Sequence, residues 1–319
     1  MILIVTVSDD VTANYVEERL LAREVSYFRL NINLVYQSGM VSVCPSLGEW
    51  VIRNDKQCVS SKDVNIVWQR RLPKPKLVHK DKHAEEYLNQ EWRLFWKWWI
   101  NQFPEDHILD PEWRLNRAAN KFEQLYLATK LGLKTPDSLV TSDHDDLVKF
   151  RRKHCAVVAK TLGGFGKITG PGESMVIYTS RVPPSDTSRT EELKLAPVLF
   201  QEEIIKDYEL RVTAVGNKLF SCKIESQKNE KTSLDWRHYD LPNTPHSPYD
   251  LPDKVGKQLL SISKTMGVSF CSFDLAVTPE GEYVFFEMNP NSQWVWIEKL
   301  TDLPITDELI SLLCERSAK

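Results

Sequence analysis

The stretch that decides the fold, residues 273–291, reads FDLAVTPEGEYVFFEMNPN. Two runs rich in β-branched and aromatic residues flank a short Pro/Gly turn, and this pattern predicts a β-hairpin. Glu287 and Asn289 are two residues apart, so both side chains lie on one face of the second strand, which Asp274 on the first strand can reach. Two carboxylates and an amide oxygen suit Mg²⁺ that also holds nucleotide phosphates. The alternative is a solvated face with scattered acids, and the apolar run 284–286 argues against it.

Size and composition exclude several classes of protein. The chain has 319 residues, enough for about two domains, and its 42% hydrophobic and 27% charged residues are ordinary for a globular protein. The net charge of −3 argues against a general nucleic-acid binder, and no apolar run is long enough to span a membrane. Residues 1–7 lack the features of a signal peptide, and the six scattered cysteines indicate free thiols. We therefore expect a cytoplasmic protein.

The first hundred residues predict an α/β unit. A strand over 2–7, a helix over 11–23 and a strand over 27–30 give a β-α-β order with a parallel pair. Residues 84–103 form a helical pattern with tryptophans at helical spacing. A ligand-stacking platform is one interpretation, but a large core is favoured because such tryptophans mostly bury area. Trp98 lies off the helix face that the other tryptophans share, so a role in a protein–protein interface is the alternative for this residue.

The centre of the chain carries candidate phosphate-binding residues. After a predicted helix over 116–131, a short strand ends at Lys160, whose ammonium suits phosphate oxygens. Gly163, Gly164 and Gly166 permit a loop that folds over phosphates, although a plain hairpin turn explains them equally well. The loop lacks the Walker A spacing. Arg211, on a later strand, adds a permanent cation suited to phosphoryl charge.

In this order the pieces resemble the ATP-grasp superfamily over about residues 115 to 300. Within it the chain resembles the microviridin-type peptide macrocyclases, also called graspetide synthetases. The local matches are residues 67–71 (VWQRR), 208–213 (YELRVT), 235–237 (DWR) and 286–290 (FEMNP). Gln69 departs from the aromatic residue that family members often show before the paired arginines.

The resemblance implies a mixed α/β (α+β) architecture, the ATP-grasp fold preceded by a pre-ATP-grasp α/β domain. The implied division is an N-terminal domain over 1–114, a central lobe with the glycine-rich loop over 115–196, and a C-terminal lobe with the metal site over 197–319.

The resemblance also implies an activity. ATP activates an Asp or Glu side chain of a ribosomal precursor peptide as an acyl phosphate, and a Ser, Thr or Lys side chain displaces phosphate to form an ester or amide. The implied cofactors are ATP and Mg²⁺, and the implied partners are a precursor peptide with a leader segment and a second copy in a homodimer.

The residue roles follow from the same resemblance. Lys121 and Lys160 hold phosphates together with the glycine loop, and Asp207 holds the ribose. Arg211 stabilises the acyl phosphate, and Arg237 orients the substrate carboxylate, although a surface ion pair explains Arg237 equally well. The remaining implied residues are the adenine hinge (Gln201, Glu202, Glu203 and Ile204) and the Mg²⁺ ligands (Asp274, Glu287 and Asn289).

Two other functions stay open at this point. An ATP-grasp ligase that joins an amino acid or dipeptide to a carboxylate would share the same nucleotide site. The paired Arg70 and Arg71 and the segment 235–237 favour the peptide macrocyclase. A non-catalytic, nucleotide-gated peptide binder is the third interpretation, and it has no need of a complete metal set.

Overall fold

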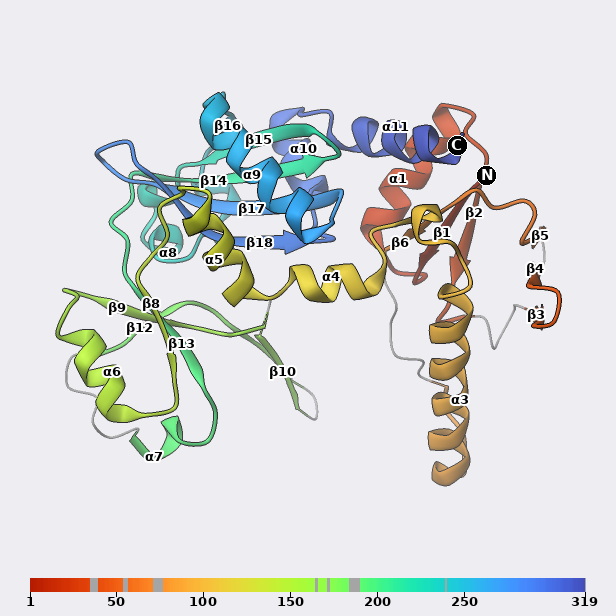
Figure 1. Ribbon diagram of the computed structural model, residues 1–319, viewed down its shortest axis with the longest axis horizontal. Coiled ribbons are helices and arrows are strands. Elements are labelled where there is room, and N and C mark those ends of the chain that lie inside the picture. Colours follow the sequence, from red (N-terminus) through yellow and green to blue (C-terminus); the bar gives the residue numbers. More distant parts are fainter. Residues whose placement is uncertain are drawn as a thin grey trace. The chain divides into compact units, whose positions relative to one another are not determined.

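The fold is described from a computed structural model (Figure 1). It describes residues 1–34, 40–53, 57–70, 77–163, 166–170, 173–183, 190–238 and 240–318. The chain forms two compact units, one built from Met1–Leu115, Gln293–Glu298 and Pro304–Lys319, the other from Asn116–Ser292 and Lys299–Leu303. The predicted division into three consecutive parts does not include this return of the chain to the first unit, and it stays a prediction.

The first unit is built on a parallel sheet with the strand order β2-β1-β6-β7. Its strands are β1 (Ile2–Thr6), β2 (Tyr27–Asn31), β6 (Ile66–Gln69) and β7 (Ile108–Leu109). Leu3 and Val5 pack with Trp96 and Trp99 of α3 (Lys82–Ile100), whereas α11 (Ile305–Ser317) contacts β1, β6 and α1 (Val11–Ala22). A parallel sheet needs such cover on both faces, which explains why all five residues of β1 are buried.

Smaller elements complete this unit. An antiparallel meander places its buried Trp50 and Ile52 in the same core as the α3 tryptophans. Its strands are β3 (Met40–Cys44), β4 (Glu49–Arg53) and β5 (Cys58–Ser60). The predicted core role of the tryptophans is confirmed for Trp96 and Trp99, while Trp98 is 63% exposed.

The second unit contains two antiparallel sheets and a separate hairpin. The first sheet has the order β12-β9-β13-β8, and Leu147 and Phe150 of α6 (His144–Arg151) pack on it. Its strands are β8 (Ser138–Thr141), β9 (Val157–Lys160), β12 (Ser180–Arg181) and β13 (Val198–Glu202). The hairpin joins β10 (Gly166–Gly170) to β11 (Glu173–Ile177), and α7 (Thr190–Leu193) follows β12 along the chain.

The second sheet carries the hairpin that the sequence predicts over residues 273–291. Its order is β16-β15-β14-β17-β18, and α5 (Lys121–Lys130) contacts β18. The strands are β14 (Tyr208–Val215), β15 (Lys218–Ile224), β16 (His246–Pro248), β17 (Phe270–Val277) and β18 (Tyr283–Pro290). The helices α8 (Glu230–Ser233) and α9 (Asp253–Met266) belong to this part, whereas α10 (Val295–Thr301) is divided between the two units. The predicted hairpin is therefore confirmed.

Two local predictions are corrected. The single helix expected over 116–131 is two helices, α4 (Glu112–Ala118) and α5, because the Asn120 side chain accepts hydrogen bonds from the Phe122 and Glu123 amides and starts a new helix. The stretch 228–252 is polar and proline-rich, a composition that predicts a loop, but it contains α8, β16 and short 3-10 turns. The described cysteines are free, as expected. Across the described ranges, no helix is both apolar and long enough to cross a membrane.

Candidate active site

A β-bulge shapes the hairpin that carries the predicted metal ligands. Asp274 pairs with Glu287 in the ladder, but the next pair is Leu275 with Phe285, so Phe286 has no opposite residue. Phe285 is fully buried, whereas Phe286 lines a pocket on the other side of the sheet. Bulges of this kind re-aim side chains next to active sites. The bulge thus places Phe286 and Glu287 together at the pocket while Asp274 stays opposite Glu287.

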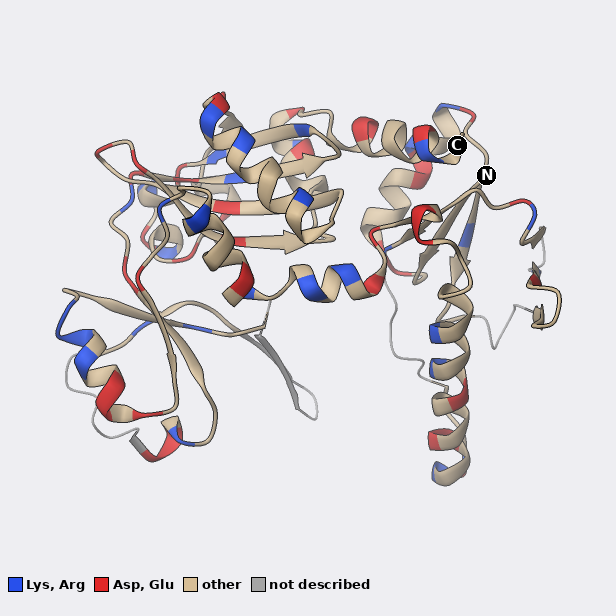
Figure 2. Cartoon of the chain, in the orientation of Figure 1, with Lys and Arg blue, Asp and Glu red and all other residues tan. Residues whose placement is uncertain are grey.

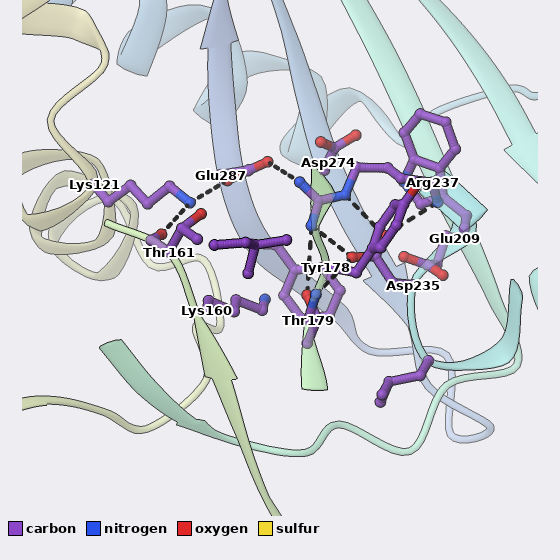
Figure 3. A pocket seen from close by; sticks show the side chains of 14 residues that line it. Lys121, Lys160, Thr161, Tyr178, Thr179, Glu209, Asp235, Arg237, Asp274 and Glu287 are labelled. Atoms are coloured by element: carbon purple, nitrogen blue, oxygen red, sulfur yellow. Dashed lines mark hydrogen bonds and ion pairs between the residues drawn. The ribbon is translucent and has the colours of Figure 1, made fainter. Parts of the chain in front are cut away.

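The carboxylates of this pocket are each held by a cation. Both oxygens of Asp274 accept hydrogen bonds from Arg211 Nη1 at 2.8 Å, and Glu287 Oε2 lies 2.9 Å from Lys121 Nζ. Asn289 Nδ2 donates to Asp274 at 2.9 Å and to Glu287 at 3.4 Å. The structure therefore brings together the three predicted metal ligands, and it places two predicted phosphate or acyl-phosphate cations against them. Figure 3 shows Lys121 beside Glu287, with Asp274 nearby.

The position of Lys121 follows from how α5 docks on β18. Asn120 caps the helix, so Lys121 is its first residue. One turn later, Gln124 is buried and pairs with the backbone of Met288, accepting from its amide at 2.9 Å and donating to its carbonyl at 2.8 Å. This side chain extends the ladder at a strand edge and fixes the distance between Lys121 and Glu287.

Arg237 is held by a buried carboxylate. Asp235 accepts from Arg237 Nε at 2.8 Å and from Nη2 at 2.6 Å, and it also accepts from the Thr179 amide at 3.1 Å. The opposite side of the guanidinium faces Glu287, with Nη1 3.9 Å from Oε1. Such a bidentate pair fixes the guanidinium plane. Arg237 is therefore a positioned group of the pocket rather than the surface ion pair that the sequence left open.

The electrostatics of these groups are set by burial and by close charges. Burial alone would raise the pKa of Glu287, but Lys121 and Arg237 outweigh it and lower the pKa to about 2. Burial raises the pKa of Asp274 against the opposing charge of Arg211, and the Glu287 carboxylate raises it further. A pair of carboxylates whose pKa values are pushed apart is typical of a site that binds or neutralises charge.

Lys160 lies at the junction of this pocket with a second cavity. Its ammonium is 4.4 Å from the centre of the Phe286 ring, and burial lowers its pKa to about 8. Lys206 Nζ is 5.8 Å from the same ring centre and pairs with Glu209 Oε1 at 2.7 Å. Burial raises the pKa of Glu209, and Lys206 opposes that shift.

The predicted adenine hinge lines the second cavity, which has a volume of about 210 Å³. Glu202, Glu203 and Ile204 line it. It shares Lys160 and Phe286 with the pocket of Asp274 and Glu287 described above, which we call the charged pocket. The Glu203 amide donates to Ala156 O at 3.0 Å. Because this amide is already bonded, an adenine base would form its hydrogen bonds with the Glu203 carbonyl or with the backbone after Glu203.

Several predicted residues lie outside these two pockets. Gln201 is buried against Ser138, with its amide nitrogen 3.0 Å from the hydroxyl, and Asp207 is exposed. Gly163 is exposed and Gly166 begins β10, whereas Gly164 falls outside the described residues. Arg211 lies behind Asp274 and does not line the charged pocket.

Reasoning from the sequence did not single out several residues that line the charged pocket: Thr161, Ile177, Tyr178, Thr179, Glu209, Leu234 and Phe286. Glu209 was the easiest of these residues to predict from the sequence. It is a charged residue of the motif YELRVT, on a strand whose residues after Tyr208 are all buried. No local signal marks Tyr178 or Thr179, which reach the pocket because β12, directly after them, pairs with β9.

The residues fit a divalent cation with phosphate ligands. In the parts of the chain that the structure describes, no three His, Cys, Asp or Glu side chains form a metal cluster. The predicted set instead has two carboxylates and the Asn289 amide, whose oxygen would face the carboxylates after a half-turn of the amide. The Arg211 Nε is buried with no partner among the described residues, as expected of a donor awaiting an anion.

Comparisons with known proteins give the family. The family model of the MvdD pre-ATP-grasp domain matches residues 1–116. The macrocyclase MdnC from Microcystis aeruginosa, solved with the precursor peptide MdnA, is 30% identical, with 98% of this chain and 99% of that chain covered and a TM-score of 0.85. A RiPP-associated ATP-grasp ligase from Chryseobacterium gregarium, solved with ADP and a leader and core peptide, is 28% identical, with 99% and 96% covered and a TM-score of 0.87.

A more distant similarity reaches human N-acetylaspartylglutamate synthase A, which is 24% identical over 213 residues. That alignment covers 62% of this chain and spans half the length of the human enzyme. The near-complete match to MdnC, together with the pre-ATP-grasp domain and the fold, shows that the chain is a ligase with the ATP-grasp fold and belongs to the graspetide-type ATP-grasp ligases, the family of the MdnC macrocyclase.

Proposed function

We propose that this protein uses ATP to crosslink side chains of a ribosomal precursor peptide. A peptide carboxylate takes the terminal phosphoryl group of ATP, ADP leaves, and a hydroxyl or amine of the same peptide displaces phosphate to close an ester or amide. The observation that carries the proposal is the position of Glu287, which faces Lys121 on one side and Arg237 on the other, next to a hinge cavity.

The nucleotide is proposed to lie across the two connected pockets. Lys121 and Lys160 would neutralise its phosphates, and the backbone after Glu203 would meet the adenine. Asp274, Glu287 and Asn289 would hold Mg²⁺, and the bound ion would neutralise the negative charge of the phosphoryl oxygens. In its absence Lys121 pairs with Glu287 and Arg211 pairs with Asp274.

Glu209 is a better proposal than Asp207 for the ribose hydroxyls. Glu209 is buried and lines the charged pocket, and its pair with Lys206 places it beside the hinge cavity. Asp207 is exposed and lines neither of these pockets.

Arg237 is proposed to bind the peptide carboxylate that is activated. Asp235 holds its guanidinium, so its orientation is set before the peptide arrives and less entropy is lost on binding. Arg211 is proposed to stabilise the acyl phosphate by its positive charge from behind Asp274, since it does not line the pocket.

The proposed partner is a precursor peptide with a leader segment. MdnC was solved with its precursor peptide, and the Chryseobacterium ligase with leader and core peptides, which supports this class of substrate here. A homodimer is also proposed, because α3 exposes Tyr87 (61%) and Trp98 (63%), and sedimentation velocity of the purified protein tests it.

The test is the intact mass of a precursor peptide after incubation with the protein, ATP and Mg²⁺. Loss of one water (about 18 Da) per bond, absent without ATP and absent with Glu287→Ala, is the expected result. A mass gain equal to an added amino acid would instead indicate an amino-acid ligase, which the similarity to the human synthase makes the second candidate.

A further inference from the structure

A groove of about 500 Å³ lies in the second unit, outside the charged pocket. It is lined by one face of α6, by Arg152 and the segment 154–157, and by residues 181–183. Val148, Val157 and Val182 give it an apolar floor. We call it the basic groove, because all five charged or titratable side chains that line it besides Cys155 are basic: His144, Arg151, Arg152, His154 and Arg181.

Some of these basic groups are already matched by acids behind the groove. Arg181 makes a bidentate pair with Glu203, with distances of 2.8 and 2.6 Å, and His154 lies 2.9 Å from Asp137. Arg151 and Arg152 differ from them. Within the described chain, neither guanidinium has a hydrogen bond or an ion pair.

The helix dipole accounts for only part of this arrangement. Acidic residues begin α6 and basic residues end it, as Figure 2 shows, and that order is favourable in any helix. The dipole does not explain why two unpaired arginines border an apolar floor with no carboxylate lining it. Arginine clusters over such floors are typical of sites that recognise acidic peptide segments.

We propose that the basic groove binds a carboxylate-rich segment of the peptide substrate, which is an inference that rests on the proposed function. A peptide that supplies Asp and Glu side chains for crosslinking carries several negative charges at once. Arg151 and Arg152 would hold carboxylates that await reaction, and the valine floor would take the apolar side chains between them.

Arg181 connects this groove to the hinge cavity. It lines both, and its partner Glu203 belongs to the proposed adenine hinge. A peptide carboxylate drawn to Arg181 would compete with Glu203, so occupation of the groove and nucleotide affinity should be coupled, and the coupling must be equal in both directions.

Binding is tested on the full chain without nucleotide. The probe is a synthetic peptide in which glutamate alternates with leucine, and its lysine–leucine counterpart is the control ligand. The double variant Arg151→Glu/Arg152→Glu should lower the affinity for the acidic peptide by at least about tenfold. Lys153→Glu removes the same kind of charge from the same loop but lies outside the groove lining, and it should change the affinity by less than about twofold. Equal losses in both variants would show non-specific attraction and overturn the proposal.

A second readout uses Cys155, an exposed thiol that lines the groove. The acidic peptide should slow alkylation of Cys155 and leave the exposed Cys44 and Cys58 unaffected. An unchanged rate of Cys155 alkylation at saturating peptide would reject the proposal that the peptide binds in the basic groove. Protection of Cys155 in a protein that never removes water from a precursor peptide would reject the proposed function and leave the groove standing.

Discussion

The low pKa of Lys160 gives a prediction for nucleotide binding. Burial beside Phe286 lowers the pKa of this ammonium from 10.5 to about 8. Because the proposed role of Lys160 is to neutralise phosphate, only its protonated form should bind ADP well. A single group with this pKa predicts an affinity that is about twofold weaker at pH 8 than at low pH, and about tenfold weaker at pH 9.

The assay is calorimetric titration of ADP between about pH 6.5 and 9.5, with a chelator present so that no divalent metal contributes. Lys160→Arg keeps its charge throughout this range and should give a flat profile. Lys160→Met should also be flat, with weak affinity at every pH. A flat profile for the unmodified protein, or the same decline in Lys160→Arg, would refute the reasoning.

The same shift affects stability with a defined sign. Between about pH 8 and 10.5 the unfolded chain keeps the Lys160 proton that the folded chain has lost, so the unfolded state binds more protons. Folding stability should therefore rise with pH in this window, by up to about 3 kcal/mol from this group. Urea denaturation of Lys160→Met should lack that rise.

Three further variants test the geometry of the site. Asp235→Asn releases Arg237 from its bidentate partner, and we expect a loss of about 2–3 kcal/mol in urea denaturation and a fall in crosslinking on the order of a hundredfold. Gln124→Leu leaves the Met288 amide and carbonyl without partners and should cost about 2–4 kcal/mol in the same assay. Lys121→Met frees Glu287, so Mg²⁺ without nucleotide should bind about tenfold more tightly in calorimetry, while ATP affinity falls.

Matched controls separate these effects from general damage. Asp240→Asn changes a carboxylate that bonds Asn229 and Asn243 but not Arg237, and it should leave crosslinking intact. Gln258→Leu removes one bond from an exposed amide to the Leu131 carbonyl and should cost less than about 1 kcal/mol. Mg²⁺ affinity unchanged in Lys121→Met would contradict the view that Lys121 competes for Glu287.

Much of the fold could be predicted from the chain alone, because its elements are set by short-range patterns. The two β-rich runs within residues 273–291 predicted the first hairpin. Gly216 and Asn217, between the runs 210–215 and 219–224, predict the neighbouring one. The error at 116–131 has the same local origin. The helical periodicity there runs on through Asn120, and only the observed hydrogen bonds show that its side chain caps a second helix.

The candidate site was less predictable, because its parts meet through strand pairing between distant segments. Arg237 and Asp235 are two residues apart, yet their value as a clamp depends on the Thr179 amide and on Glu287 facing the guanidinium. The alternation of β18 also gave no sign that Phe286 is bulged. A bulge depends on the register of the partner strand, which no local pattern records.

The sequence by itself determined the order of the elements, the family resemblance and the carboxylate–amide set of the hairpin, since each depends on residue types at short spacings. The tertiary structure alone decided which cation meets which carboxylate, because Lys121 reaches Glu287 only where α5 docks on β18. It also decided that Glu209 lines the pocket and Asp207 does not. Burial and pairing across the sheet are properties of the assembled strands, and they fix the charge state on which the chemistry depends.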